Sequence, residues 1–211
     1  GQSCVAGSRL YLQDKVADRF LDTLVSRAKQ IRVGDPLLEE TQMGPLATKG
    51  QLDRIEREVA IAEDQGGKIL TGSKRSSGMN RGLFYDPTII ECRSQNDRIV
   101  DTELFGPVLS VLRFKTEDEV ISLANDTKYG LAAGVFTRNG ARALRVSKKL
   151  RAGIVWVNTY RVVSPIAEFG GFKESGFGRE SGFQAIYDYT RPKTVWINTS
   201  EEPLANPFVM R

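Results

Sequence analysis

Strands and helices alternate in the second half of the chain, and this alternation is the strongest constraint on the fold. The apolar pattern predicts strands over residues 108–114, 132–136 and 154–158, each separated from the next by one helix. Thr116 with Glu119 forms a capping-box pattern at the start of the first of these helices. Strands joined by single helices form parallel β-α-β units with helices over the sheet. We therefore predict an α/β protein with a mainly parallel sheet.

The first half of the chain carries the same two element types. Residues 9–13 read as a strand, and we expect Asp14 to cap the helix that follows it. Thr48 and Gln51 predict a capping box at the start of a second helix. Strands are also expected over residues 68–70 and 88–92, with Cys92 in the core.

Asn158 ends the last strand of the alternating region. In open parallel sheets, ligands bind beyond the carboxyl ends of the strands. Asn158 is therefore a better site candidate than any residue inside that strand.

Charge and cysteine content narrow the functional classes. The net charge is +4, but the 30 lysines and arginines are spread along the 211 residues. No motif that combines basic and aromatic residues accompanies them, so we predict no nucleic-acid binding. The two cysteines lack metal-ligand or disulfide spacing, which favours a reducing cytoplasm and no metal. No apolar run approaches the roughly 20 residues that span a bilayer, so no membrane association is expected.

Cys4 lies among small residues, an arrangement that leaves a sulfur accessible. The chain has no histidine, which excludes a Cys-His pair, a Ser-His-Asp triad and a histidine metal site within it. A reactive Cys4 would need backbone amides, a helix N-terminus or a carboxylate base to form its thiolate. The alternative is a small buried residue with no chemical role.

Three segments together resemble the aldehyde dehydrogenase superfamily. Residues 1–9 read Gly-Gln-Ser-Cys-Val-Ala-Gly-Ser-Arg, similar to that family's nucleophile segment. Residues 103–107 match its Glu-x-Phe-Gly-Pro motif, and residues 158–180 resemble its Asn-x-Tyr loop followed by Phe-Gly-Gly-x-Lys-x-Ser-Gly-x-Gly-Arg-Glu. The resemblance implies a three-layer catalytic domain of helices around a mainly parallel sheet.

The resemblance also implies a reaction and roles for individual residues. Cys4 would attack an aldehyde to form a thiohemiacetal, a hydride would pass to NAD or NADP, and water would hydrolyse the resulting thioester. Glu103 would hydrogen-bond the nicotinamide ribose and Phe105 would pack against the cofactor. The implied substrate-side residues are Asn158, Tyr160, Arg161 and Phe169.

Two residues depart from the family pattern. Glu168 stands where the motif usually has proline, and Arg161 places a cation where the loop can face the substrate tunnel. We favour an Arg161–Glu168 ion pair at the surface, since such pairs are common. The alternative is that Arg161 recognises a semialdehyde that bears a carboxylate.

Only the C-terminal part of the family pattern is matched. The implied cofactor domain, oxyanion asparagine and general-base glutamate would precede residue 1, so we expect a fragment that alone neither binds NAD well nor turns over. We assign residues 1–192 to a catalytic domain and 193–211 to an oligomerisation strand, over 194–198, and a tail. A homo-dimer or tetramer is expected. An acylating, coenzyme A-dependent enzyme and a non-catalytic interaction module remain alternatives.

Overall fold

The computed structural model describes residues 1–78, 81–202, 206, 208 and 209. The first half contains β1 (Arg9–Gln13), α1 (Asp14–Lys29), α2 (Lys49–Asp64), β2 (Lys68–Thr71), β3 (Thr88–Glu91), α3 (Arg98–Asp101) and β4 (Val108–Phe114). The second half contains α4 (Glu117–Asn125), β5 (Ala132–Val135), α5 (Gly140–Lys149), β6 (Ile154–Val157), a 3-10 turn (Lys173–Ser175) and α6 (Ala185–Tyr189). The longest of these helices, α1 and α2, have 16 residues, and no described helix is long and apolar enough to cross a membrane.

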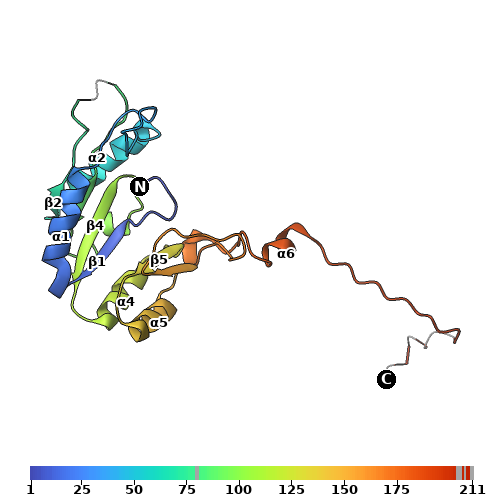
Figure 1. The fold of residues 1–211 in the computed structure, drawn as a ribbon. Coiled ribbons are helices and arrows are strands. Elements are labelled where there is room, and N and C mark those ends of the chain that lie inside the picture. Colours follow the sequence, from blue (N-terminus) through green and yellow to red (C-terminus); the bar gives the residue numbers. More distant parts are fainter. Residues whose placement is uncertain (79–80, 203–205, 207, 210–211) are drawn as a thin grey trace.

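Four strands form the larger sheet, in the order β1-β4-β3-β2 (Figure 1). β4 pairs in parallel with β1 on one side, where Arg9 faces Ser110, and with β3 on the other, where Thr88 faces Val108. β2 adds an antiparallel edge. Because β1 and β4 run in the same direction, the segments that precede them meet at one edge of the sheet.

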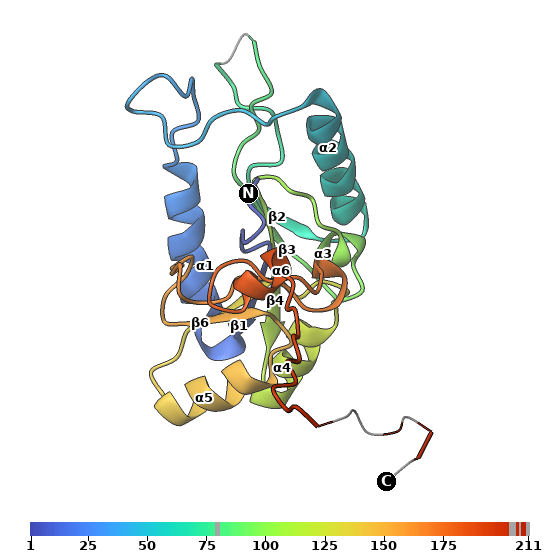
Figure 2. The same cartoon turned by 90° about the vertical axis from the view of Figure 1, so that its right-hand side faces the viewer.

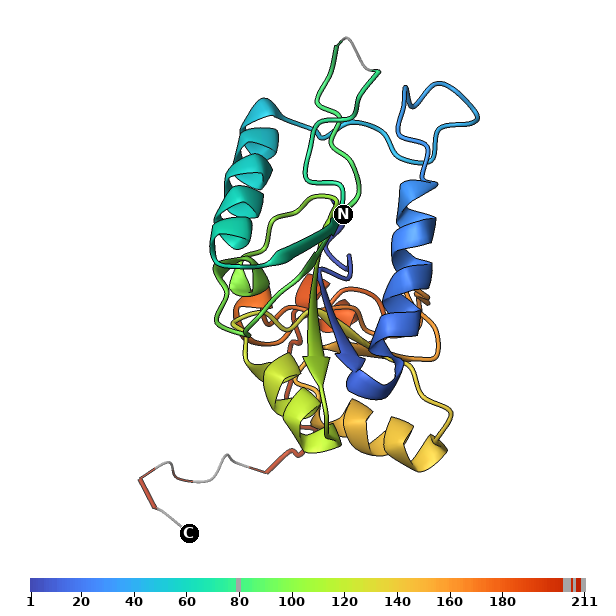
Figure 3. The ribbon, with the colours of Figure 1, turned by 90° about the vertical axis from the view of Figure 1, so that its left-hand side faces the viewer.

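Helices cover both faces of this sheet (Figure 3). On one face, α1 packs its apolar stripe on side chains of β1, β3 and β4; the buried members are Leu12, Ala17, Leu21, Ala28, Ile89 and Val111. On the other face lies the larger core under α2 and α3, which includes Leu52, Ile55, Val59, Ile90, Ile99, Val100 and Leu112. The expected arrangement of helices around a mainly parallel sheet is therefore confirmed.

β5 and β6 form a separate parallel sheet, with α5 as their connection. The β-α-β unit predicted between these two strands is correct. The chain from β4 through α4 does not extend the first sheet at β4, because β1 and β3 already occupy both of its edges. The alternation in the sequence does not reveal this split into two sheets.

The residues predicted to cap the helices are confirmed only in part. Thr116 and Glu119 form the complete capping box, and Asn139 accepts a hydrogen bond from the backbone of Arg142. The Asp14 prediction is wrong: the helix already begins at Asp14, and the preceding Gln13 makes no side-chain cap. Thr48 caps α2 by accepting from the Gln51 amide, but the Gln51 side chain binds elsewhere.

The C-terminal part extends away from the body (Figure 1). The Glu180 backbone is paired with Phe169 in an antiparallel bridge, and the last helix, α6, begins after it at Ala185. Residues 194–198 form no strand in this chain, and Trp196 is 92% exposed. Among the described residues, no backbone hydrogen bond joins residues 194–198 to another segment. The predicted tail includes Pro203 and Pro207, which lie outside the described residues.

Candidate active site

Cys4 lies on a tight turn just before β1. The turn is closed by a 2.9 Å hydrogen bond from the Ala6 amide to the Ser3 carbonyl, with Cys4 and Val5 between them. Val5 is buried and anchors the turn, whereas Cys4 is exposed. This contradicts the alternative of a small buried residue. Cys92 differs: it packs partly buried against the larger core, as expected, and burial raises the pKa of its thiol to about 11.

The Glu103 loop, residues 102–107 between α3 and β4, touches the Cys4 segment, residues 1–8 before β1. A Cβ added to Gly1 would lie 1.7 Å from the Gly106 carbonyl oxygen, so the two backbones are in direct contact. Gln2 also fixes this segment, because its side-chain oxygen accepts a 3.1 Å hydrogen bond from the Ala47 amide next to α2. Two motifs about a hundred residues apart in the sequence are thus neighbours in the fold.

The Glu103 loop is held by α2. Leu104 is buried, and Gly106 allows the loop to approach α2 closely, since a Cβ there would lie 2.2 Å from Ile55 Cδ1. Phe105 has a φ of +53°, in the left-handed region that few non-glycine residues adopt. The Gln51 side-chain nitrogen donates to the carbonyl oxygens of both Leu104 and Phe105. Glu103 and Phe105 are left exposed at the surface.

Gln51 is a site residue that the sequence analysis did not identify. Its position three residues after Thr48 fits the capping box so well that the sequence gives no reason to assign it a second role. Only the approach of the Glu103 loop to α2 makes Leu104 and Phe105 available as partners.

Tyr160 connects β6 to the Cys4 turn. Its hydroxyl donates a 3.0 Å hydrogen bond to the carbonyl of Val5, the residue after Cys4. The ring lies 4.8 Å from the Trp156 ring, and Gly134 of β5 leaves room for it, since a Cβ there would be 2.9 Å from Tyr160 Cδ2. Burial raises the pKa of the Tyr160 phenol, and the charge of Arg161 acts in the opposite direction. The structure therefore brings Tyr160 next to Cys4.

Asn158 lies beside Tyr160, but both ends of its amide are occupied. Its oxygen accepts from the Thr137 amide and its nitrogen donates to the Thr137 carbonyl, each at 2.9 Å. These bonds join the carboxyl ends of β5 and β6 and hold Asn158 at a φ of +54°. In this conformation the amide fixes the loop that carries Tyr160.

The ion pair that we favoured between Arg161 and Glu168 is not formed. No ion pair or hydrogen bond joins these two described residues. Glu168 instead packs near Gly182, while the neighbouring Phe169 exchanges two 2.7 Å backbone hydrogen bonds with Glu180. Phe169 is half-buried in this hairpin-like bridge, and its hydrogen bonds join it to Glu180 rather than to the Cys4 turn.

The site combines the amino ends of strands in the larger sheet with the carboxyl end of a strand in the smaller one; β1, β4 and β6 are labelled in Figure 2. Cys4 and Glu103 precede β1 and β4, so they lie at the amino ends of parallel strands, whereas Asn158 and Tyr160 follow the carboxyl end of β6. The rule that ligands bind at carboxyl ends therefore locates only half of it. Two surface hollows lie elsewhere, one beside Lys173 and Arg151 and the other between α1 and β2. The described residues contain no cluster of three groups suited to a metal ion.

Together these features define an α/β chain that presents an accessible thiol on a braced turn, in contact with a loop that exposes a carboxylate and a phenylalanine. Comparison with known proteins identifies the protein family. Residues 1–195 match the Aldehyde dehydrogenase family, and the chain belongs to that family.

Individual relatives are similar over the whole chain. A (Z)-2-((N-methylformamido)methylene)-5-hydroxybutyrolactone dehydrogenase of Acinetobacter baylyi is 50% identical over 100% of this chain and 43% of its own length. A betaine aldehyde dehydrogenase of Mesorhizobium japonicum is 43% identical over 99% of this chain and 43% of its own length. The chain thus spans less than half the length of these relatives.

Solved structures of similar sequence also share the fold of this chain. PnpE from Pseudomonas sp. WBC-3 is 43% identical, with a TM-score of 0.94 over 99% of this chain and 43% of its own. A mutant betaine aldehyde dehydrogenase from Staphylococcus aureus, in complex with NAD+, is 39% identical, with a TM-score of 0.92 over the same shares of the two chains.

Proposed function

We propose that this chain is the cysteine-bearing portion of an NAD(P)-dependent aldehyde dehydrogenase that oxidises an aldehyde to a carboxylic acid. The observation that carries the proposal is that the Cys4 thiol is exposed and that the segment carrying it contacts the Glu103 loop. Family membership and relatives named as dehydrogenases support the same reaction.

Cys4 performs the covalent chemistry. Its thiolate adds to the aldehyde carbon, so that a carbon–sulfur bond forms and the carbonyl π electrons move to oxygen, which gives a thiohemiacetal. Loss of hydride from that carbon leaves a thioester on Cys4. Water then adds to the thioester carbonyl, and cleavage of the carbon–sulfur bond releases the acid and regenerates the thiolate. No histidine is available to accept the thiol proton. We expect a carboxylate base in the part of the relatives that this chain does not span.

The Glu103 loop fits a nicotinamide cofactor. An exposed carboxylate can accept hydrogen bonds from both hydroxyls of a ribose, and the exposed Phe105 offers a flat apolar surface beside it. When bound, NAD or NADP would supply the hydride acceptor. Gln51 keeps the loop in place by binding its backbone, which fixes the position of the carboxylate relative to the Cys4 segment. The NAD+ complex of the Staphylococcus aureus neighbour supports NAD.

We further propose the organisation expected from the sequence. Residues 1–192 form the catalytic domain, and residues 193–211, with the exposed Val195, Trp196 and Ile197, join subunits into a cytoplasmic homo-oligomer that acts on a small aldehyde. The chain alone would not turn over, because the cofactor domain would be supplied by the remainder of the longer enzyme.

The proposal is tested in the full-length protein by replacing each cysteine in turn. Cys4→Ser should abolish NADH formation from aldehyde, whereas the matched control Cys92→Ser should retain it, since Cys92 lies in the core region. Product analysis with and without coenzyme A identifies the acyl acceptor. Undiminished turnover in Cys4→Ser would refute the catalytic role, and a coenzyme A thioester product would establish the acylating alternative.

A further inference from the structure

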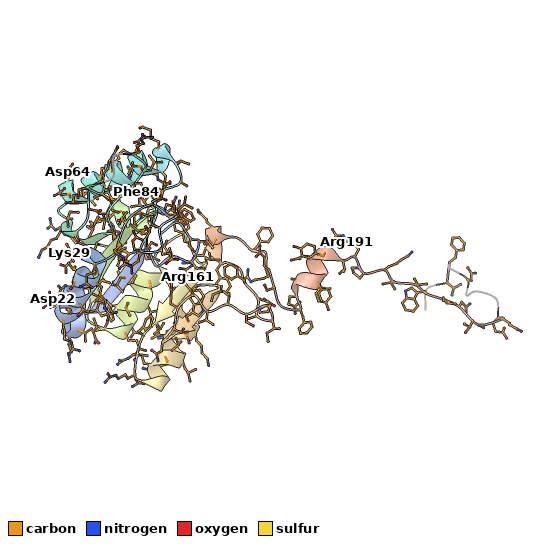
Figure 4. All side chains as sticks on the ribbon, turned by 45° about the horizontal axis from the view of Figure 1, so that its top comes forward. Asp22, Lys29, Asp64, Phe84, Arg161 and Arg191 are labelled. Carbon is orange, nitrogen blue, oxygen red and sulfur yellow. The ribbon has the colours of Figure 1, made fainter. Side chains whose placement is uncertain are left out.

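Glu58 is a buried carboxylate that the proposed reaction does not use. Its side chain is 2% exposed and lies in the second half of α2, the helix whose last residue, Asp64, is labelled in Figure 4. Both carboxylate oxygens accept 2.7 Å hydrogen bonds from Arg98, through Nε and Nη2 of the guanidinium. Arg57, on the same helix, approaches only to 3.7 Å. A buried pair of this kind is weak evidence for stability, because desolvation of the charges offsets their attraction. The segments that it joins are more informative.

The pair joins α2 to the helical turn that leads into the Glu103 loop. Arg98 is the first residue of α3, which lies against α2 (Figure 2). The apolar side of α3 is fixed in the larger core through Ile99 and Val100, each 3% exposed. The amide of Thr102, at the end of this helix, donates a 3.1 Å hydrogen bond to the Arg98 carbonyl. Glu103 is the next residue, so its backbone continues directly from a turn that α2 holds.

Two other polar residues on the same side of α2 bind the same segment. Gln51, Glu58 and Gln65 follow one another at intervals of seven residues, about two helical turns, and therefore form one row along the helix. Gln65 accepts a 3.3 Å hydrogen bond from the Arg98 amide, and Gln51 donates to carbonyl oxygens of the Glu103 loop. This row thus contacts both the beginning of α3 and the loop that follows it.

We propose that Glu58 and Arg98 are positioning residues for the cofactor: their ion pair fixes α3 on α2 and thereby sets the position of the Glu103 carboxylate. The inference rests on the proposed function, in which Glu103 binds the nicotinamide ribose. A carboxylate and a guanidinium joined by two parallel hydrogen bonds are fixed in orientation as well as in distance. Precise placement matters because a displacement of about 1 Å can remove much of the benefit of correct orientation.

The test measures the Kd for NAD in the full-length protein by calorimetry, without aldehyde. Glu58→Gln keeps the shape of the side chain but removes its charge, and it should raise the Kd by about 10-fold, the factor that corresponds to one charge-assisted hydrogen bond. Arg98→Gln should raise the Kd further, because it leaves the Glu58 carboxylate buried without its main partner. Arg98→Lys keeps a charge but loses the planar fork, so its effect should be smaller than that of Arg98→Gln.

Two control variants on α2 separate positioning from general stability. Glu56→Gln breaks another two-bond pair on this helix, with Arg75 at 2.7 and 2.9 Å, but Arg75 lies in the segment that is bridged to Tyr85 and not in α3. Val59→Ala creates a cavity in the same core, one residue after Glu58, and should lower the free energy of unfolding. Neither control should change the Kd for NAD.

Hydrogen exchange gives a second readout that needs no cofactor. The amides of residues 102–106 should exchange faster in Glu58→Gln than in the wild type and in Val59→Ala. A Kd that is unchanged in Glu58→Gln, or raised equally in Val59→Ala, would overturn the inference, and so would unchanged exchange of residues 102–106 in Glu58→Gln. If the wild type does not bind NAD, the proposed function fails, and the exchange measurement alone then decides whether the ion pair fixes the Glu103 loop.

Discussion

Gln51 offers the most direct test of how the candidate site is held together. Among the described residues of α2, Gln51 is the only one whose side chain hydrogen-bonds the Glu103 loop. It donates to two consecutive carbonyl oxygens, those of Leu104 and Phe105. Gln51→Ala removes both hydrogen bonds. At about 0.5–1.5 kcal/mol for each bond, the loop loses about 1–3 kcal/mol of stabilisation. Phe105 would then be free to leave its left-handed conformation.

This loss should appear in cofactor binding. If the Glu103 loop positions the ribose, 1–3 kcal/mol corresponds to a rise of about 5- to 150-fold in KM for NAD. The KM for aldehyde should change much less, because the Cys4 turn is braced separately by Tyr160. Gln51→Glu should be at least as harmful as Gln51→Ala, since a carboxylate would face the two carbonyl oxygens.

Steady-state kinetics of the full-length protein, with NAD and aldehyde varied separately, measure both constants. The control is Lys49→Gln on the same helix, which breaks only the exposed Lys49–Asp53 pair. Hydrogen exchange gives a readout that needs no cofactor: amides of residues 103–106 should exchange faster in Gln51→Ala. An unchanged KM for NAD together with unchanged exchange in this loop would refute the reasoning.

Two further predictions concern packing and pH. Gly106→Ala should destabilise the fold by about 1–3 kcal/mol, because its Cβ would overlap Ile55 Cδ1, and Ile55→Val should recover part of this loss in denaturant unfolding; no recovery in the double variant would contradict the packing argument. Burial raises the pKa of Cys92 to about 11 from an ordinary value of 9.0, so the folded state keeps a proton that the unfolded state releases first. Its contribution to stability is therefore complete below pH 9 and is lost as the pH rises toward 11. Cys92→Ala should flatten this fall in unfolding curves measured across that range, and identical slopes in the two proteins would argue against it.

The strands were predictable from sequence because each is a short apolar run bounded by turn residues. β4 and β6 begin and end within a residue of the predicted limits. Which strands pair with each other was harder to predict, since it depends on which strand edges are free after the sheet forms. Both edges of β4 are occupied, and β5 and β6 form their own two-stranded sheet. Periodicity reports which side chains are buried, and not which strands are neighbours.

The two capping-box patterns show the same limit at the level of single side chains. The Glu119 carboxylate turns back and accepts hydrogen bonds from the Thr116 and Lys115 amides. Gln51 has the same spacing from Thr48 but donates to carbonyls some fifty residues away in the sequence. An amide side chain can donate as well as accept, whereas the Glu119 carboxylate can only accept. The tertiary fold supplied acceptors for the Gln51 donor, and local spacing could not foresee them.

Arg161 and Glu168 failed as a pair for a related reason. Only six residues of loop lie between them, which made a local ion pair reasonable, yet each is held by different contacts. Arg161 is held through Tyr160 and Val162 to β6 and the Cys4 turn, while Glu168 is followed by the bridge between Phe169 and Glu180. The candidate site thus depends on contacts between distant segments: the amino ends of β1 and β4 in the four-stranded sheet supply the thiol and the carboxylate, and the carboxyl end of β6 supplies the tyrosine. Because Tyr160–Val5 is a hydrogen bond across this junction, a change that shifts one sheet relative to the other should alter the placement of Cys4 before it alters either core.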